Sequence, residues 1–432
     1  ECTVSDLVIK NATLSNGDVV DIKLTGDRIV ELGEGLDAEA SIDASGLIAL
    51  CGFVDLHTHL REPGLEAAET VLSGSRAAAM GGYTAVHAMA NTNPVADNAA
   101  VVEQVYRLGQ LAGYVDVYPI GAVTVGLRGE QLAELGTMAK SEAKVRVFSD
   151  DGKCVSDPLL MKRAMEYVKQ FGGVIAQHAQ DPALTVGAQM NDGTVSSELG
   201  LTGWPGVAEE VIIARDVLLA ESLGSRLHIC HLSTARSVDI VRWAKQRGIN
   251  VTAEVTPHHL LLTDELARTY DPVYKVNPPL RTATDVEALR AGLADGTIDI
   301  VATDHAPHPS ELKECEWDAA AFGMIGLETA ASVAQLALIE SGLADWSRLE
   351  QVMSLKPAEI AGDSDHGAGI VVGAIANITL VDPKAKRQIS NPTQSKSSNN
   401  PFEGLTLPGR IVHTFFRGRL TVRDGRIVEQ VN

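Results

Sequence analysis

Histidines and aspartates stand where short apolar runs of this sequence end. His57 and His59 form an H-x-H pair, ATDHAPH places Asp304 after another run, and His178 and His231 each close a run of their own. Residues two apart on a β-strand point to the same side, so the H-x-H pair can share one ion. Imidazole nitrogens and carboxylate oxygens are common zinc ligands, so the pattern predicts a metal centre.

A fourth run ends in VFSDDG, which adds Asp150 and Asp151 as candidate carboxylates. Four imidazoles with two carboxylates exceed what one tetrahedral zinc uses, and they suit a two-metal site with a bridging acid. A lone histidine at a strand end is more often a hydrogen-bonded core residue than a ligand. Ligand-type residues at five strand ends on one edge argue against that alternative here.

The other histidines lack this support, and we interpret them as structural. His305 is expected to support Asp304 rather than to bind metal. The remaining structural histidines are His87, His228, His258, His259, His366 and His413.

The segment from residue 53 to about 365 alternates short apolar runs with amphipathic stretches. The expected strands are 53–59, 83–89, 115–121, 145–149, 173–178, 226–231, 250–255 and 299–303. Apolar strands separated by amphipathic helices indicate parallel pairing with both faces covered. Eight such units predict an α/β fold, a (β/α)8 TIM-like barrel with its active site at the carboxyl ends of the strands. An open doubly wound sheet would place a glycine-rich phosphate turn where HTHLREPG stands.

Both ends of the chain show the alternation of β-strands. DLVIKNATL and VVDIKL lie near the start, and RIVHTFFRGRLTVRDGRIVEQ lies near the end. We therefore expect a small β-sandwich domain built from both termini, residues 1–51 and 366–432, beside a barrel of residues 52–365.

Composition restricts the class of partner and the compartment. The net charge of −20 argues against a nucleic acid or an anionic membrane as partner. No apolar run reaches the length of a membrane span, and ECTVSDLVIK does not have the pattern of a secretory signal. Five scattered cysteines without a C-x-x-C pair favour a reducing, cytoplasmic location.

The chain resembles the amidohydrolase superfamily, and within it the dihydroorotases that bridge their metals with an aspartate. The resemblance runs nearly end to end, and its most specific strings are HTHLREPG, VNPPLR and ATDHAPH in this order. It implies two Zn²⁺ per chain. By resemblance the ligands are His57, His59 and Asp304 for one ion, His178 and His231 for the other, and Asp151 between them. Many relatives bridge with a carbamylated lysine, and Arg146 is expected at that position here.

The two ions would activate a water molecule and suit an anionic substrate. Asp304 is the expected catalytic residue, taking a proton and returning it to the departing nitrogen. Arg61 leaves the strand on the ligand side, where it can bind a carboxylate; the alternative is a surface ion pair with Glu62 or Glu66. By resemblance the substrate-binding residues are His59, Arg61, Asn91, Asn277, His308, Phe322 and Gly323.

Asn91 and Asn277 have an alternative interpretation as turn residues. The stretch 305–325 carries few core signals and is expected to form a mobile lid.

The resemblance implies reversible hydrolysis of dihydroorotate to N-carbamoyl-L-aspartate in pyrimidine synthesis. A hydantoinase or allantoinase is the nearest alternative, and it should carry the strand-four lysine and lack Arg61, Asn91 and His308. A non-catalytic scaffold of aspartate transcarbamoylase is the other, and it should have lost metal ligands. Association as a homodimer or with aspartate transcarbamoylase stays open.

Overall fold

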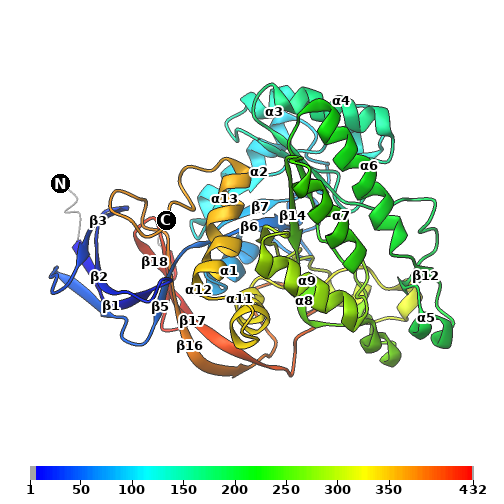
Figure 1. The fold of residues 1–432 in the computed structure, drawn as a ribbon. Coiled ribbons are helices and arrows are strands. Elements are labelled where there is room, and N and C mark those ends of the chain that lie inside the picture. The colour runs from blue at the N-terminus through cyan, green and yellow to red at the C-terminus, as the bar shows by residue number, and fades with distance from the viewer. Residues whose placement is uncertain (1–5, 431–432) are drawn as a thin grey trace.

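The computed structural model describes residues 6–430 of the chain. A barrel of strands surrounded by helices forms the larger part, and a β domain beside it contains strands from both ends of the chain (Figure 1). Among the described residues, no helix combines the length and the apolar character that crossing a membrane requires.

Eight parallel strands form the barrel. They are β6 (Phe53–Thr58), β7 (Tyr83–Ala88), β8 (Asp116–Pro119), β9 (Val147–Phe148), β10 (Val174–Gln177), β13 (Leu227–Ile229), β14 (Val251–Val255) and β15 (Ile300–Val301). The first three pair in order, and so do the last five. Single bridges between Gly121 and Phe148 and between Thr58 and His305 join the two groups into a closed ring. The predicted barrel is confirmed.

Every barrel strand lies within an expected run, and most of the strands end before the run does. The backbone stops pairing with the neighbouring strands at or just before the histidine and aspartate positions. Three residues that follow barrel strands, Arg61, His231 and Asp304, have φ values of 64°, 25° and 47°. Left-handed backbone is uncommon outside glycine and concentrates at functional sites, which sets these strand ends apart from ordinary turns.

Helices cover the outside of the barrel (Figure 1). The α-helices of the described residues are α1 (Val71–Met80), α2 (Ala99–Ala112), α3 (Leu135–Lys140), α4 (Pro158–Lys169), α5 (Thr194–Leu199), α6 (Val207–Leu223), α7 (Ala235–Gln246), α8 (Pro257–Leu261), α9 (Ala283–Asp295), α10 (Ser310–Lys313), α11 (Ala330–Ala334), α12 (Trp346–Glu350) and α13 (Lys356–Ala361), of which α5 lies away from the barrel beside β12. Side chains such as Asn98 and Asp157 accept a backbone N–H from the first turn of the helix that follows, which fixes where α2 and α4 begin.

The β domain is one nine-stranded sheet. Its strands are β1 (Asp6–Leu14), β2 (Val19–Thr25), β3 (Arg28–Gly33), β4 (Ala40–Asp43), β5 (Ile48–Cys51), β16 (Ile378–Gln388), β17 (Thr406–Phe416), β18 (Arg419–Arg423) and β19 (Arg426–Ile427). Antiparallel pairing of β5 with β16 joins the strands of the two termini. Ile9, Ile22, Ile378 and Phe415 are fully buried in its own core. The terminal β domain is thus confirmed as well. A short parallel pair, β11 (Met190–Asn191) and β12 (Gly203–Trp204), lies apart from both sheets.

The buried carboxylate of Asp55 fastens β6 to the loop after β15. It accepts hydrogen bonds from Thr58 Oγ1, from Thr303 Oγ1 and from Thr303 N, the last at 2.9 Å. Asp55 is fully buried, so these bonds satisfy a group that would otherwise be costly to bury. They hold the first and last barrel strands together next to the His57 and Asp304 positions.

Candidate active site

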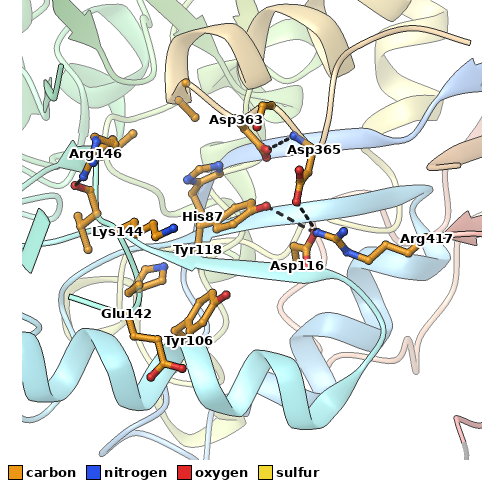
Figure 2. Close-up of a pocket in the computed structure, with 17 residues that line it drawn as sticks. His87, Tyr106, Asp116, Tyr118, Glu142, Lys144, Arg146, Asp363, Asp365 and Arg417 are labelled. Atoms are coloured by element: carbon orange, nitrogen blue, oxygen red, sulfur yellow. Dashed lines mark hydrogen bonds and ion pairs between the residues drawn. The ribbon is translucent and has the colours of Figure 1, made fainter. Parts of the chain in front are cut away.

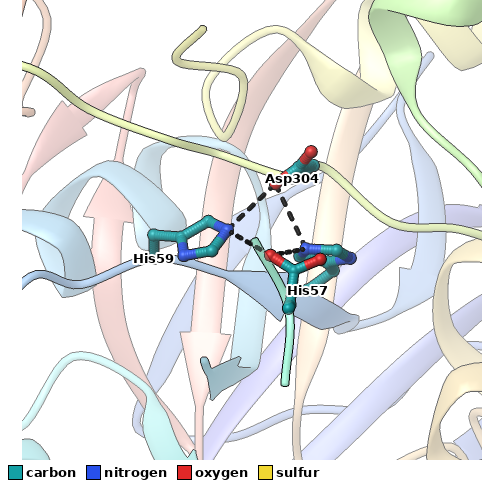
Figure 3. A group of neighbouring side chains, drawn as sticks. His57, His59 and Asp304 are labelled. Carbon is teal, nitrogen blue, oxygen red and sulfur yellow. Dashed lines mark hydrogen bonds and ion pairs between the residues drawn. The ribbon is translucent and has the colours of Figure 1, made fainter. Parts of the chain in front are cut away.

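Two histidines and two aspartates face one another at the carboxyl ends of the barrel strands (Figure 3). His57 Nε2 lies 3.2 Å from Asp151 Oδ2 and 3.2 Å from Asp304 Oδ1. His59 Nε2 lies 3.1 Å from each of the same oxygens. All four side chains are buried. Residues from three strand ends therefore converge on one point.

The second oxygen of Asp151 faces another pair of histidines. Asp151 Oδ1 lies 3.1 Å from His178 Nδ1 and 3.4 Å from His231 Nε2, and these two nitrogens are 3.0 Å apart. Asp151 thus gives one oxygen to each pair of histidines. Asp150 points elsewhere and accepts hydrogen bonds from the backbone N–H groups of Val123 and Thr124. The structure brings all six predicted ligands together, with Asp151 rather than Asp150 between the pairs.

The spacing of these atoms fits metal ions. Zinc about 2.0 Å from each of its ligands places tetrahedral ligand atoms roughly 3.3 Å apart, close to the separations found here. His57 Nε2 is buried and has no hydrogen-bond partner, although two carboxylate oxygens lie near it. A cation between these atoms would satisfy all of them, so the residues present fit a metal at this position.

The electrostatics keep both carboxyl groups in the form that binds metal. Burial alone would raise the pKa of Asp304, but His57 and His59 outweigh it and hold that pKa well below its usual range. Burial likewise opposes ionisation of Asp151, and His57, His178 and His231 hold its pKa well below the usual value. Both groups are therefore anionic at neutral pH.

Glu254 orients two of the histidines and was missed by the sequence reasoning. At the end of β14, it accepts from His57 Nδ1–H and, at 2.9 Å, from His228 Nε2–H, and its Oε1 also accepts the His231 N–H at 3.2 Å. Burial alone would raise the pKa of Glu254, but His57 and His228 hold it at about 2. Such outer carboxylates fix which ring nitrogen faces a metal.

Gln180 and Asn91 orient two other histidine rings in the same way, those of His178 and His59. Gln180 Oε1 accepts from His178 Nε2–H at 2.7 Å and from Asn277 Nδ2 at 3.2 Å. Asn91 Oδ1 accepts from His59 Nδ1–H at 2.8 Å. Sequence reasoning missed Gln180, whose only signal is its position two residues after His178. The sequence predicted Asn91 and Asn277 as substrate-binding residues, and it did not predict their hydrogen bonds with His59 and Gln180.

Arg61 lies beside the six residues His57, His59, Asp151, His178, His231 and Asp304, hereafter the His/Asp group, and its guanidinium is buried. Only 8% of the residue is exposed, and Nε donates to Pro307 O at 3.1 Å while Nη2 approaches His308 Nε2 at 3.4 Å. Glu62 and Glu66 instead accept backbone N–H groups, so the alternative of a surface ion pair is wrong. Burial lowers the pKa of Arg61 to about 10, which leaves it charged at neutral pH.

His308, Phe322 and Gly323 form one unit next to Arg61. His308 Nε2–H donates to Phe322 O at 2.8 Å, and burial lowers the pKa of His308 to about 3, so the ring is neutral. Gly323 has φ 153°, and a Cβ there would lie 2.7 Å from His308 Nε2. Glycine is required for this close approach.

The stretch expected to be a mobile lid contains two large buried side chains, although most of residues 310–319 are exposed. Lys313 is 5% exposed, and its ammonium donates to Lys275 O, Ala321 O and Gly323 O at 3.1, 2.8 and 2.9 Å. Trp317 is equally buried. A lysine with three carbonyl partners is satisfied without solvent, and the polar pattern of the sequence hides this arrangement.

Two supporting interpretations are wrong. His305 does not hydrogen-bond to Asp304: its Nε2 donates to Glu69 Oε2 at 2.9 Å, and its Nδ1 accepts from Gly326 N at 3.1 Å. Arg146 lies at the opposite end of β9 from Asp151, donating to Ala139 O and Val145 O. It therefore does not occupy the place of a bridging lysine, and Asp151 itself stands between the histidine pairs.

Known proteins resemble this chain over almost its whole length. A family described as "Dihydro-orotase-like" matches residues 46–237. A dihydroorotase of Leifsonia xyli is 64% identical over 98% of both chains. One of Streptomyces coelicolor is 62% identical over 98% of this chain and 100% of its own. One of Mycobacterium tuberculosis is 53% identical over 95% and 96%.

Solved structures show the same fold at lower identity. An L-hydantoinase (dihydropyrimidinase) from Arthrobacter aurescens has a TM-score of 0.88 and 25% identity, covering 99% of this chain and 98% of its own. A dihydropyrimidinase from Brevibacillus agri has a TM-score of 0.84 and 23% identity over 98% and 96%. The much higher identity lies with the relatives above, and the chain belongs to the dihydroorotase family of cyclic amide hydrolases.

Proposed function

We propose that this chain catalyses the reversible hydrolysis of dihydroorotate to N-carbamoyl-L-aspartate, a step of pyrimidine synthesis, with two Zn²⁺ per chain. The observation that carries the substrate assignment is the buried guanidinium of Arg61, which hydrogen-bonds to a carbonyl and approaches an imidazole rather than a carboxylate. A buried cation without an anionic partner is costly, and a substrate carboxylate would offset that cost. The full-length relatives named dihydroorotase support the same reaction.

The proposed ligands are divided between two ions. His57, His59 and Asp304 would hold one, His178 and His231 the other, and Asp151 would give one oxygen to each. When bound, the ions supply Lewis-acid chemistry, lowering the pKa of a water molecule and polarising the scissile carbonyl. Glu254, Asn91 and Gln180 would keep three of the rings in the required orientation.

Asp304 is the proposed catalytic residue. Its Oδ1 faces His57 and His59, which leaves Oδ2 to handle a proton. As the water oxygen bonds to the ring carbonyl carbon, Asp304 accepts the water proton. As the C–N bond breaks, Asp304 returns the proton to the departing nitrogen, so that it is regenerated as carboxylate.

The substrate carboxylate is proposed to lie on Arg61, beside Asn91 and the neutral ring of His308. Arg61 supplies the charge, and the amide Nδ2 of Asn91 can donate because its Oδ1 is already used by His59. Asn277 and the backbone of Phe322 and Gly323 are proposed to contact the ring of the substrate. The substrate carboxylate would then be bound by Arg61 next to Asp304, where the ring is opened.

Three further points belong to this proposal. The division into residues 1–51 with 366–432 and residues 52–365 is expected to separate two folding units. Association as a homodimer or with aspartate transcarbamoylase is compatible with the resemblance and stays open. A cytoplasmic location agrees with the free thiols of Cys51, Cys154, Cys230 and Cys315.

The test compares ring opening of dihydroorotate, hydantoin and allantoin by the metal-loaded protein. We expect about two zinc ions per chain and activity confined to dihydroorotate. Arg61→Met should lower kcat/KM by about 100-fold, because it removes a buried charge partner of the substrate. Arg128→Met, which removes an exposed arginine, should leave it unchanged. A preference for hydantoin, or an unaltered kcat/KM in Arg61→Met, would overturn the assignment.

A further inference from the structure

A second cavity opens at the amino end of the barrel, away from the His/Asp group. Its volume is about 570 Å³, and it is lined by the first residue of β8, Asp116, by Lys144 and Arg146 before β9, by residues after α13 and by Arg417 of the β domain (Figure 2). None of the six residues of the His/Asp group lines it. A cavity of this size is within the range of small-molecule sites.

The charges on one wall of the cavity are already paired. Arg417 Nη2 lies 2.6 Å from Asp116 Oδ2 and 2.9 Å from Asp365 Oδ2. His366 Nε2 donates to the same oxygen of Asp116 at 2.7 Å. This cluster joins the β domain to the barrel, so we assign it a structural role.

His87 is different because it is buried without a partner. It is 5% exposed, and its Nε2 has no hydrogen bond. Burial lowers the pKa of His87 to about 3, so the ring is neutral and carries one donor and one acceptor. Its ring packs against Tyr118 with centroids 5.1 Å apart. Buried polar groups almost always have partners, so the unpaired Nε2 of His87 at the cavity wall is free to bond to a ligand.

Lys144 is an exposed residue at the rim of the cavity, and no described carboxylate lies within ion-pair distance of its ammonium. Figure 2 shows its ammonium directed toward His87 and Tyr118. Across the cavity, Asp363 Oδ2 also has no partner, although it is buried. An unpaired ammonium, a neutral imidazole, a tyrosine ring and the carboxyl group of Asp363 therefore line the same space.

We propose that this cavity binds a small organic anion, with its acid group on Lys144 and its hydrogen-bonding ring against His87 and Tyr118. The lysine provides the charge complement, and the imidazole provides a donor and an acceptor for the edge of the ring. Tyr118 provides an aromatic surface on which a planar ring packs. The acid group is a carboxylate or a phosphate. The proposal is independent of the reaction at the other end of the barrel.

Calorimetric titration of the metal-loaded full chain tests this proposal. The probes are uridine 5′-monophosphate for the phosphate and nicotinate for the carboxylate, with inorganic phosphate alone as a third titrant. At least one of the two organic probes should bind with Kd below about 1 mM. Lys144→Glu should weaken that binding by about tenfold or more, since it reverses the charge that meets the acid group.

Two controls locate the binding. Lys140→Glu makes the same charge change at an exposed lysine outside the cavity, and it should leave Kd unchanged. Arg61→Met alters the proposed substrate site and should also leave Kd unchanged. Both Lys144→Glu and Lys140→Glu should keep the activity of the unaltered protein.

The outcomes separate the alternatives. Binding of uridine 5′-monophosphate alone identifies an organic phosphate, binding of nicotinate alone a carboxylate, and binding of both the shared chemistry. Binding of inorganic phosphate with neither organic probe would mean an adventitious ion only and would overturn the proposal. So would binding by neither organic probe, binding that Lys144→Glu leaves intact, or binding that Arg61→Met abolishes.

Discussion

His59 donates its Nδ1–H to Oδ1 of Asn91 over 2.8 Å. The hydrogen bond leaves His59 Nε2 facing Asp151 and Asp304 and leaves the amide Nδ2 of Asn91 available as a donor. One amide thus connects the proposed metal site with the proposed substrate site. Loss of the Oδ1 acceptor should therefore weaken metal binding, whereas loss of the Nδ2 donor should weaken substrate binding.

Two substitutions of Asn91 separate these consequences. Asn91→Asp keeps an oxygen acceptor for His59 but places a negative charge beside the substrate carboxylate. It should retain metal and raise KM by about tenfold or more. Asn91→Ala removes the acceptor and should weaken zinc binding by about 10- to 100-fold, measured by competition with a chelator. Equal zinc affinity in the two variants would show that the His59 contact has no part in holding the ion.

Glu254 should govern metal affinity through His57. Glu254→Gln keeps an oxygen near His57 Nδ1 but removes the charge, so zinc affinity should fall by about 10- to 100-fold. Glu209→Gln is the matched control, since Glu209 is also 1% exposed and accepts from Ser233 and Ser237 instead of a histidine. The control should lose stability in urea unfolding and retain its zinc affinity. Similar zinc affinities in the two variants would contradict a role for Glu254 in the metal site.

Lys313 should fix the loop that carries Phe322 and Gly323. Lys313→Met removes one hydrogen-bond donor from three backbone carbonyls, and those of Lys275 and Gly323 keep a second donor in Gly323 N–H and Asn399 Nδ2. The contact of His308 with Phe322 should loosen, and KM for dihydroorotate should rise by about tenfold with a smaller change in kcat. Lys162→Met, at an exposed i,i+4 pair with Glu166, serves as the control and should not alter KM. An unchanged KM in Lys313→Met would mean that the loop holds its shape without this lysine.

Asp216 should make stability depend on pH. It is fully buried, and burial raises its pKa from 3.8 to about 6 in spite of Arg215 and Gln177. Between these values the folded state keeps a proton that the unfolded state has released. Below about pH 4, Asp216 is protonated in both states and does not affect the free energy of unfolding. Above about pH 6 it is ionised in both states, and its burial lowers the free energy of unfolding by at most about 3 kcal/mol. Stability from this group falls as pH rises through that window.

Asp216→Asn removes the penalty and tests this sign. Urea unfolding should show the variant more stable than the unaltered protein at pH 7.5, with the difference shrinking toward pH 4.5. A variant that is less stable by the same amount at both pH values would show that lost contacts with Arg215 and Gln177 dominate instead.

The barrel and five of the six His/Asp positions could be predicted from local sequence, whereas the choice of Asp151 over Asp150 rested on the resemblance. An apolar run followed by His or Asp marks where a strand ends, and parallel strands bring such ends to one edge. The partners of these residues could not be predicted in the same way. Glu254 hydrogen-bonds to His57, 197 residues away in sequence, and no spacing pattern in the sequence predicts that contact.

The errors arose where a side chain had more than one plausible partner. His305 follows Asp304 directly, yet it hydrogen-bonds to Glu69, which is distant in sequence and fully buried. Arg146 lies on the expected strand, but at its other end, because the strand begins only at Val147. Lys313 is polar in sequence and buried in the structure. Only tertiary packing decides such cases.

The central claim is that Asp151 lies between two metal ions, one oxygen on each. Anomalous X-ray scattering at the zinc edge from crystals of the metal-loaded protein tests it directly. We expect two peaks, one about 2.0 Å from Nε2 of His57 and His59 and the other at the same distance from Nδ1 of His178 and Nε2 of His231. A single peak, or two peaks of which one lies beyond coordination distance of Asp151, would contradict the claim.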